Sequence, residues 1–141
     1  MKKQWKILLV LLMIVLAAAG YGLYLFNAKP ADVRTIEADY SLSATNLMDD
    51  FNKDEAAANL KYLNKVISVK GKVSDIKLEQ STGQATIILD SGDPIASITC
   101  SFYADEAGSV KQIKEGEEIV VKGKCTGKLT DIILNKCSIE K

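Results

Sequence analysis

A run of twenty uncharged, mostly apolar residues from Ile7 to Phe26 constrains this chain more than any other feature of its sequence. At a rise of about 1.5 Å per residue, a helix of that length spans about 30 Å, the hydrocarbon thickness of a bilayer. Trp5 stands at one end of the run and Tyr24 near the other, where aromatic rings favour the headgroup region. The run therefore predicts a transmembrane helix over residues 7–26, which follows a short basic region over residues 1–6.

The same N-terminus also fits a cleaved signal peptide, with a basic region at Lys2, Lys3 and Lys6 and a small-residue cleavage site at Ala17–Ala19. The residues after Ala19 stay apolar, whereas a mature N-terminus normally turns polar, so the sequence favours an uncleaved anchor. The three lysines before the run place the N-terminus in the cytoplasm by the positive-inside rule. We expect a single-pass protein of the cytoplasmic (inner) membrane whose residues 27–141 lie on the extracytoplasmic, periplasmic side.

The part expected to be exported lacks the usual groups of an active site. Residues 27–141 carry 15 basic and 18 acidic residues, and the chain has no histidine. Histidine is the side chain most used for proton transfer near neutral pH and the commonest metal ligand. The sequence shows neither a nucleophile with an adjacent base nor a phosphate-binding loop. It therefore predicts a protein that is not an enzyme and that needs no cofactor.

Three segments follow the apolar run. Residues 27–42 contain Pro30 and no sustained period, which is typical of a linker that holds a domain off the bilayer. Residues 43–64 space their apolar side chains as a helix does and predict a helical segment that packs on the domain. Ser43 or Thr45 is the candidate cap, and Asn52 with Glu55 resembles a capping box at which a second helix or a continuation would begin. From residue 65 onward the pattern alternates, which is typical of strands with one buried face.

The alternating region, residues 65–141, contains five predicted strands and one short helix. The strands are expected at 66–76, 85–89, 95–103, 119–125 and 131–139, and the helix at 104–114. This is the order of the OB-fold, a five-stranded Greek-key barrel with a short helix between strands 3 and 4. The predicted fold class is therefore mainly β, with an amphipathic helix and a transmembrane helix before the barrel.

Several blocks of sequence carry a family resemblance. They include Gly123-Lys124-Cys125-Thr126-Gly127, the Asp-x-x-Leu-x-x-Cys pattern from Asp131 to Cys137, Lys65–Val73 and Thr99–Phe102. Together with the helix that contains Leu47 and Tyr62, they resemble the tRNA-anticodon-like (tRNA_anti-like) OB-fold family of bacterial envelope proteins. The resemblance implies an OB-fold, export and a membrane tether, with binding as the expected activity and no particular ligand.

The three cysteines, Cys100, Cys125 and Cys137, lie in the part expected to be exported, where disulfides persist. The third and fifth strands of an OB barrel run side by side in parallel, which predicts a Cys100–Cys137 disulfide with Cys125 free. A Cys125–Cys137 bridge across a bulge and three reduced cysteines in the core are the alternatives. We expect no metal site, because no histidine and no closely spaced cysteine pair is present.

Binding by an OB barrel uses the exposed face of strands two and three with the flanking loops. Tyr103 is the aromatic residue expected to face outward there. Lys70, Lys72, Lys122 and Lys124 would form a basic strip if the first and fourth strands pair. Single-stranded nucleic acid needs a basic groove with several stacking aromatics, whereas residues 64–141 carry 11 basic and 11 acidic residues.

These features predict a non-enzymatic binding module whose ligand is a protein, a glycan or a small envelope molecule, and they make nucleic acid an unfavoured partner. A nucleic-acid-binding module that uses the lysine strip and Tyr103 is one alternative. A structural subunit of an envelope assembly is the other.

Overall fold

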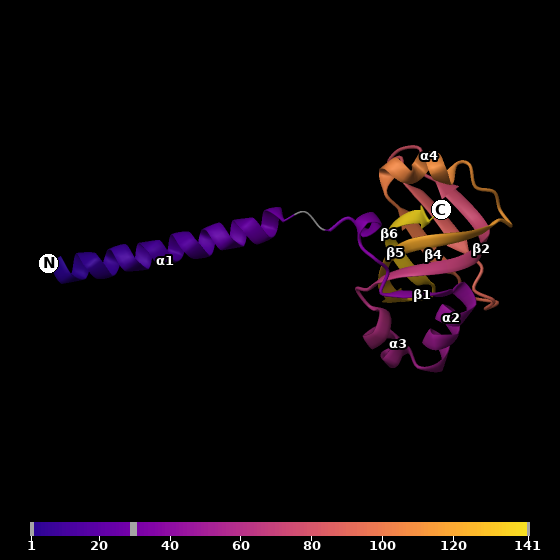
Figure 1. Cartoon of the computed structure of the whole chain (residues 1–141), viewed down its shortest axis with the longest axis horizontal. Helices are drawn as coiled ribbons and strands as arrows, with labels where there is room; N and C mark the ends of the chain where they lie inside the picture. Colours follow the sequence, from indigo (N-terminus) through magenta and orange to yellow (C-terminus); the bar gives the residue numbers. More distant parts are fainter. Residues whose placement is uncertain (1, 29–30, 141) are drawn as a thin grey trace. The chain divides into compact units, whose positions relative to one another are not determined.

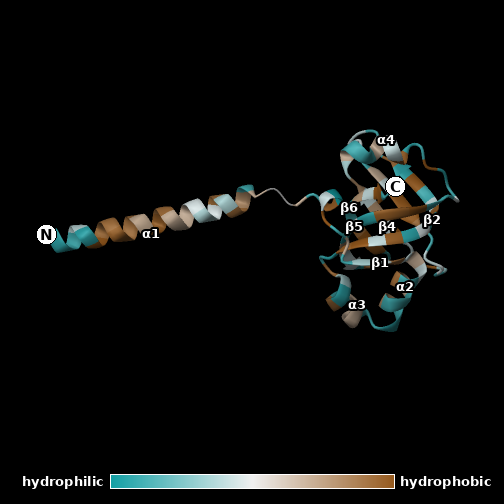
Figure 2. Cartoon of the chain, viewed as in Figure 1, coloured by the Kyte–Doolittle hydropathy of each residue, from teal (hydrophilic) through white to brown (hydrophobic). Residues whose placement is uncertain are grey.

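The computed structural model describes residues 2–28 and 31–140, which form two compact units divided between Ala31 and Asp32. The first unit contains α1 (Lys2–Asn27), a helix of 26 residues without a buried side chain. Hydrophobic residues cover much of its length (Figure 2). Within residues 2–28 and 31–140, α1 is the one helix long and apolar enough to cross a membrane. Its length and composition agree with the predicted role of residues 7–26 as a membrane anchor.

The second unit is built on a closed β-barrel (Figure 1). Its five barrel strands are β2 (Val66–Leu78), β3 (Ala85–Leu89), β4 (Ile98–Phe102), β5 (Glu118–Lys128) and β6 (Ile132–Glu140). They lie in the order β2-β3-β4-β6-β5, and pairing of β2 with β5 closes the barrel. The β4–β6 pair is parallel, while the other pairs of barrel strands are antiparallel. The predicted five-stranded OB-fold is therefore confirmed.

Residues 32–42 belong to the barrel unit, so the prediction of a linker over all of 27–42 was wrong. Val33, in the short helical turn η1 (Val33–Thr35), is only 2% exposed. Residues Tyr40–Ser43 form β1, which pairs in parallel with Ile67–Lys70 of β2. This arrangement could not be predicted from the sequence, because a single buried valine and a strand of four residues do not produce a recognisable period.

Two helices, α2 (Ala44–Lys53) and α3 (Glu55–Tyr62), follow β1 and lie at one end of the barrel (Figure 1). The Ser43 hydroxyl accepts a hydrogen bond from the Asn46 N–H at 3.1 Å, so Ser43, one of the two candidate residues, caps α2. The Asp54 carboxylate caps α3 by accepting from the Ala57 N–H at 3.0 Å. Apolar side chains of both helices enter the barrel core: Leu47, Met48, Phe51, Ala58 and Tyr62.

The opposite end of the barrel is covered by η2 (Ala104–Glu106) and α4 (Ala107–Val110) (Figure 1). This helical stretch ends at Val110, four residues before the end of the predicted helix over 104–114. Val110 is fully buried and belongs to the core. Since helices lie over both ends and side chains fill the interior, a ligand site has to be sought on the outer surface of the barrel.

Candidate functional site

The four lysines of the predicted basic strip lie on one outer face of the β2–β5 ladder, because these strands pair as expected. Lys124 lies opposite Val66, Lys122 opposite Ser68, Lys70 opposite Val120, and Lys72 opposite Glu118. The strip is not uniformly basic. The Lys70 ammonium lies 2.9 Å from a carboxylate oxygen of Glu118, and both side chains are more than half exposed. The Lys122 ammonium donates to the backbone carbonyls of Arg34 at 3.2 Å and Ile36 at 2.9 Å.

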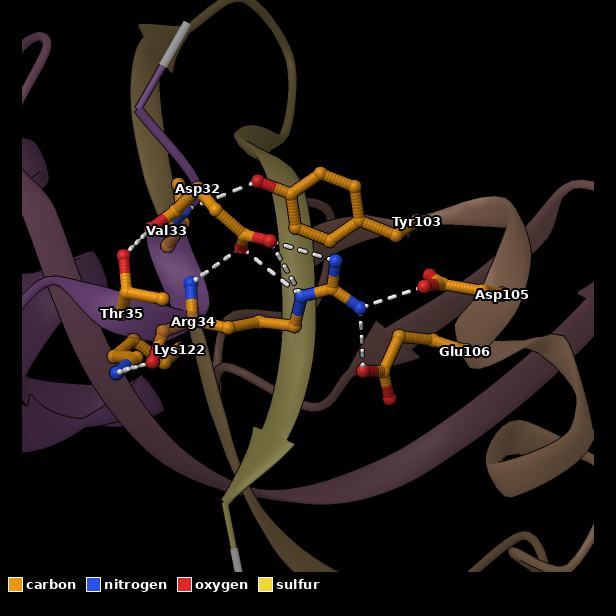
Figure 3. Close-up of polar contacts among 8 residues, drawn as sticks. All are labelled: Asp32, Val33, Arg34, Thr35, Tyr103, Asp105, Glu106 and Lys122. Atoms are coloured by element: carbon orange, nitrogen blue, oxygen red, sulfur yellow. Dashed lines mark hydrogen bonds and ion pairs between the residues drawn. The ribbon is translucent and has the colours of Figure 1, made fainter.

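Tyr103, the predicted outward aromatic, follows β4 and is covered by the segment before β1 (Figure 3). Its hydroxyl oxygen accepts a hydrogen bond from the Val33 N–H at 3.1 Å. The Arg34 guanidinium lies over the ring, with its carbon 4.5 Å from the ring centroid. A ring with one face occupied and its hydroxyl engaged is a poor platform for stacking a nucleic-acid base.

Arg34 is the one arginine among the 18 basic residues of the chain and connects several acidic groups (Figure 3). It lies 2.7 Å from Asp32, 2.8 Å from Asp105 and 3.6 Å from Glu106. Hydrogen bonds from Arg34 hold the pKa of the Asp32 carboxyl at about 2, below its usual 3.8. We call this group, Asp32, Arg34, Tyr103, Asp105 and Glu106, the Arg34 clasp.

The Arg34 clasp was not predicted from the sequence, although one signal was present. A single arginine in a chain that otherwise uses lysine is noteworthy, since the planar guanidinium binds carboxylates in a forked geometry that lysine cannot reproduce. The identity of its partners could not be read from the sequence, because Asp105 lies 71 positions away.

A groove of about 600 Å³ lies between the α4 region, the start of β5 and the end of β6. Its polar wall contains four glutamates: Glu106, Glu117, Glu118 and Glu140. Its apolar floor contains four aliphatic residues: Ile113, Ile119, Val120 and Ile139. Ser109 and Gln112 are the other lining residues, and among the residues that the structure describes no lysine or arginine lines the groove. We call this feature the acidic groove; its glutamates were not predicted as site residues.

Neighbouring groups hold the glutamates of the acidic groove in place. A Glu140 carboxylate oxygen accepts from the Ser68 hydroxyl at 2.5 Å, and one of Glu117 accepts from the Lys114 N–H at 3.1 Å. Glu118 and Glu106 form the ion pairs with Lys70 and Arg34 described above. Among the described residues, two of the four glutamates therefore have a cationic partner, and the described lining of the groove is negative. Such a surface attracts cations and repels phosphates.

The three cysteines are free thiols and are buried in the barrel core. In the parallel β4–β6 ladder, Cys100 lies opposite Leu134 and Cys137 opposite Phe102. Burial first and the neighbouring Cys100 thiol second raise the pKa of Cys137 well above its usual value. Cys125 lies opposite Leu134, not Cys137. The Cys100–Cys137 disulfide stays a prediction; in the structure the two side chains are neighbours and both thiols are free.

Within the part of the chain that the structure describes, no three carboxylates or thiols come together in a way that could hold a metal ion. The acidic groove presents carboxylates and aliphatic side chains.

Comparisons with known proteins agree with this architecture. A model of the tRNA_anti-like family matches residues 1–139. The crystal structure of a "putative nucleic acid-binding lipoprotein" from Klebsiella pneumoniae subsp. pneumoniae is similar over 80% of this chain and 100% of that chain, with 20% identity and a TM-score of 0.60. A "putative aspartyl-tRNA synthetase" from Leishmania major is similar over 86% of this chain and 25% of that chain, with 14% identity and a TM-score of 0.50. No curated protein sequence matches the chain. At these identities the structural likeness shows the fold.

Proposed function

The chain belongs to the tRNA_anti-like family of OB-fold domains, and we propose that it is a membrane-anchored binding module whose ligand is a protein segment with basic and aliphatic side chains. The ligand would lie in the acidic groove, with its cations beside the glutamates and its aliphatic side chains on the isoleucine floor. No chemical step is part of this function.

The composition of the groove is the observation that carries the proposal. Four carboxylates around a floor of aliphatic side chains complement a segment that carries lysine or arginine next to leucine, isoleucine or valine. A nucleic acid presents the opposite charge and gains most of its affinity from lysine and arginine contacts to phosphates. A neutral glycan would leave the carboxylates without charged partners. The groove therefore favours a protein ligand over a glycan or an oligonucleotide.

We further propose that α1 anchors the module in the cytoplasmic membrane and that the barrel lies on the extracytoplasmic side. The exposed apolar surface of α1 and the lysines near its start support this orientation. The similar protein from Klebsiella is described as a "putative nucleic acid-binding lipoprotein", and the word lipoprotein is consistent with a membrane-anchored module.

Binding of nucleic acid is the second candidate function. It is favoured by the lysines on the β2–β5 face, of which Lys72 and Lys124 lie at the two ends, and by the description of the Klebsiella protein. The engaged state of Tyr103 weighs against it.

The two functions are separated by measuring binding to the full chain in nanodiscs of neutral lipid. The probes are a short peptide of alternating lysine and leucine, the same peptide with glutamate in place of lysine, and a single-stranded oligonucleotide. We expect the lysine peptide to bind, with an affinity that falls as salt is added, and the other two not to bind.

A Glu117→Gln/Glu118→Gln variant should weaken binding of the lysine peptide by about tenfold. It removes two exposed charges, each of which contributes up to about 1 kcal/mol to an ion pair, and about 1.4 kcal/mol corresponds to a factor of ten. The matched control, Asp49→Asn/Glu55→Gln, removes the same charge from exposed positions of α2 and α3, outside the groove lining. Equal weakening by both variants would show that net charge and not the groove binds the peptide. Binding of the oligonucleotide alone would replace the proposal by the second function.

A further inference from the structure

The segment Asp32–Ala38, which we call the strap, crosses the outer surface of the barrel. Its helical turn η1 contacts β5 and β6. Lys122, which holds the carbonyls of Arg34 and Ile36, lies between Ser68 on β2 and Ser138 on β6 in one row of paired residues. Both serines are nearly buried, with 6% and 7% exposure. The strap therefore passes over this row of three strands.

The contacts that hold the strap are mostly polar and open to solvent. Val33 is its one buried residue. The carboxylates that face Arg34 from the barrel, Asp105 and Glu106, belong to partly exposed ion pairs, and Arg34 itself is 35% exposed. Ion pairs of this kind are individually weak and are screened by salt. The strap is thus held much less firmly than the strands beneath it.

The attachment changes at Asp39, where firm pairing with β2 begins. The Asp39 N–H donates to the Val66 carbonyl at 2.7 Å, and the Asp39 carboxylate accepts from the Val66 N–H at 3.1 Å. The parallel β1–β2 ladder follows directly. Segments with few buried contacts open locally while the paired core stays folded. Asp39 is therefore the boundary between the strap, which can open, and the paired strands, which remain folded.

We propose that the strap opens as a unit and sets the length of the tether between α1 and the barrel. With the strap closed, four residues, 28–31, separate α1 from the first residue of the barrel unit. With the strap open, eleven residues, 28–38, separate α1 from Asp39. At about 3.5 Å per extended residue, the maximum reach grows from about 14 Å to about 39 Å. Opening also uncovers the Tyr103 ring and the Lys122 ammonium, so one event changes both reach and exposed surface.

Trypsin offers a direct assay, because Arg34–Thr35 lies in the middle of the strap and trypsin cleaves after arginine. Lys29 precedes Pro30, and trypsin does not cleave Lys–Pro bonds, so Arg34 is the first cleavable site after α1. In the full chain held in nanodiscs, cleavage there releases a soluble fragment that begins at Thr35, which mass spectrometry identifies. When opening and closing are fast, the rate of release follows the population of the open strap.

The test variant is Asp105→Asn/Glu106→Gln, which removes two ion-pair partners and keeps the cleavage site. We expect release about threefold to tenfold faster than in the wild type, since exposed pairs contribute about 0.2–1 kcal/mol each. Added salt, with the protease rate normalised on a free peptide, should accelerate release from the wild type and have little effect on the variant. The matched control is again Asp49→Asn/Glu55→Gln, which should release at the wild-type rate.

Two results would overturn the proposal. One is release from the test variant at the rate of the control, which would mean that the Arg34 clasp does not hold the strap. The other is cleavage within β2 or β5 that rises in parallel with cleavage at Arg34, which would mean that the strap opens only when the barrel unfolds. Neither result depends on a ligand, so failure here is distinct from failure of the proposed function.

Discussion

Replacing Gly123 by alanine should destabilise the barrel through one identifiable contact. Gly123 lies on the inner face of β5, and a Cβ atom added there would stand 2.5 Å from the Cys137 sulfur. It would also stand 3.3 Å from the Asn135 carbonyl oxygen and the Leu134 Cβ. The sulfur has little room to move, because Cys137 is fully buried beside Cys100. Overpacking of this kind lowers the free energy of unfolding by about 1–3 kcal/mol, and we expect about 2–3 kcal/mol here.

A double-mutant cycle tests whether the sulfur is the cause. Cys137→Ala alone should lower the free energy of unfolding by about 1 kcal/mol through lost core contacts. It should also make room for the new Cβ, so the double variant should be more stable than the sum of the single changes predicts, by at least about 1 kcal/mol. Stability of the full chain in mild detergent is measured by pulse proteolysis across a urea series.

Gly108→Ala is the control, because nothing lies within 4 Å of a Cβ added at that position of α4. That substitution should be neutral or should stabilise the barrel by up to about 1 kcal/mol, through better helix propensity and a less flexible unfolded chain. Additive effects of Gly123→Ala and Cys137→Ala, within about 0.5 kcal/mol, would refute the reasoning, since the Cβ would then be accommodated without displacing the sulfur.

Three further predictions concern α3 and the cysteines. Asp54→Ala removes the cap of α3 and should lower the free energy of unfolding by about 1 kcal/mol in the same urea series. Tyr62→Phe removes a hydroxyl that donates to Asp50 at 2.5 Å and should cost about 1–2 kcal/mol at neutral pH. Burial and the hydrogen bond to Asp50 raise the pKa of Tyr62 above its usual 10.0. The stability that the neutral phenol contributes is therefore full below pH 10.0 and is lost as the pH rises through the raised pKa. In urea series at increasing pH, the Tyr62→Phe variant should not show this loss. In a non-reduced tryptic digest of oxidised protein, any bridge should join Cys100 to Cys137, with Cys125 alkylated; a Cys125–Cys137 peptide pair would contradict the register of β5 and β6.

The barrel could be predicted from the sequence because its strands alternate. Residues such as Ile98, Cys100 and Phe102 point inward in turn, and the same spacing recurs in β3 and β5. The pairing of β2 with β5 followed from closure of the barrel and correctly placed the four lysines on one face. These features are local or follow from the fold class, so one sequence suffices to find them.

The surroundings of the site could not be predicted, because they depend on contacts between distant segments. Tyr103 was predicted to face outward, but the sequence does not show that the Val33 N–H, 70 positions earlier, donates to its hydroxyl. The acidic groove arises where the α4 region approaches β5 and β6, and the pattern of each segment alone indicates only solvated surface. The cap of α3 is Asp54, whereas the spacing of Asn52 and Glu55 resembled a capping box and indicated a cap two residues earlier.

The parallel pairing of β1 with β2 has a consequence for how the barrel behaves in solution. The first half of β2 is paired on both sides, with β5 on one side and β1 on the other. A fragment that begins after β1 would leave the backbone N–H and carbonyl groups of Ile67–Lys70 bare along one edge, and a bare edge is a template on which strands of other molecules add. The four residues of β1 thus cover this edge of β2, and a soluble fragment that is to stay monomeric should begin no later than Asp39.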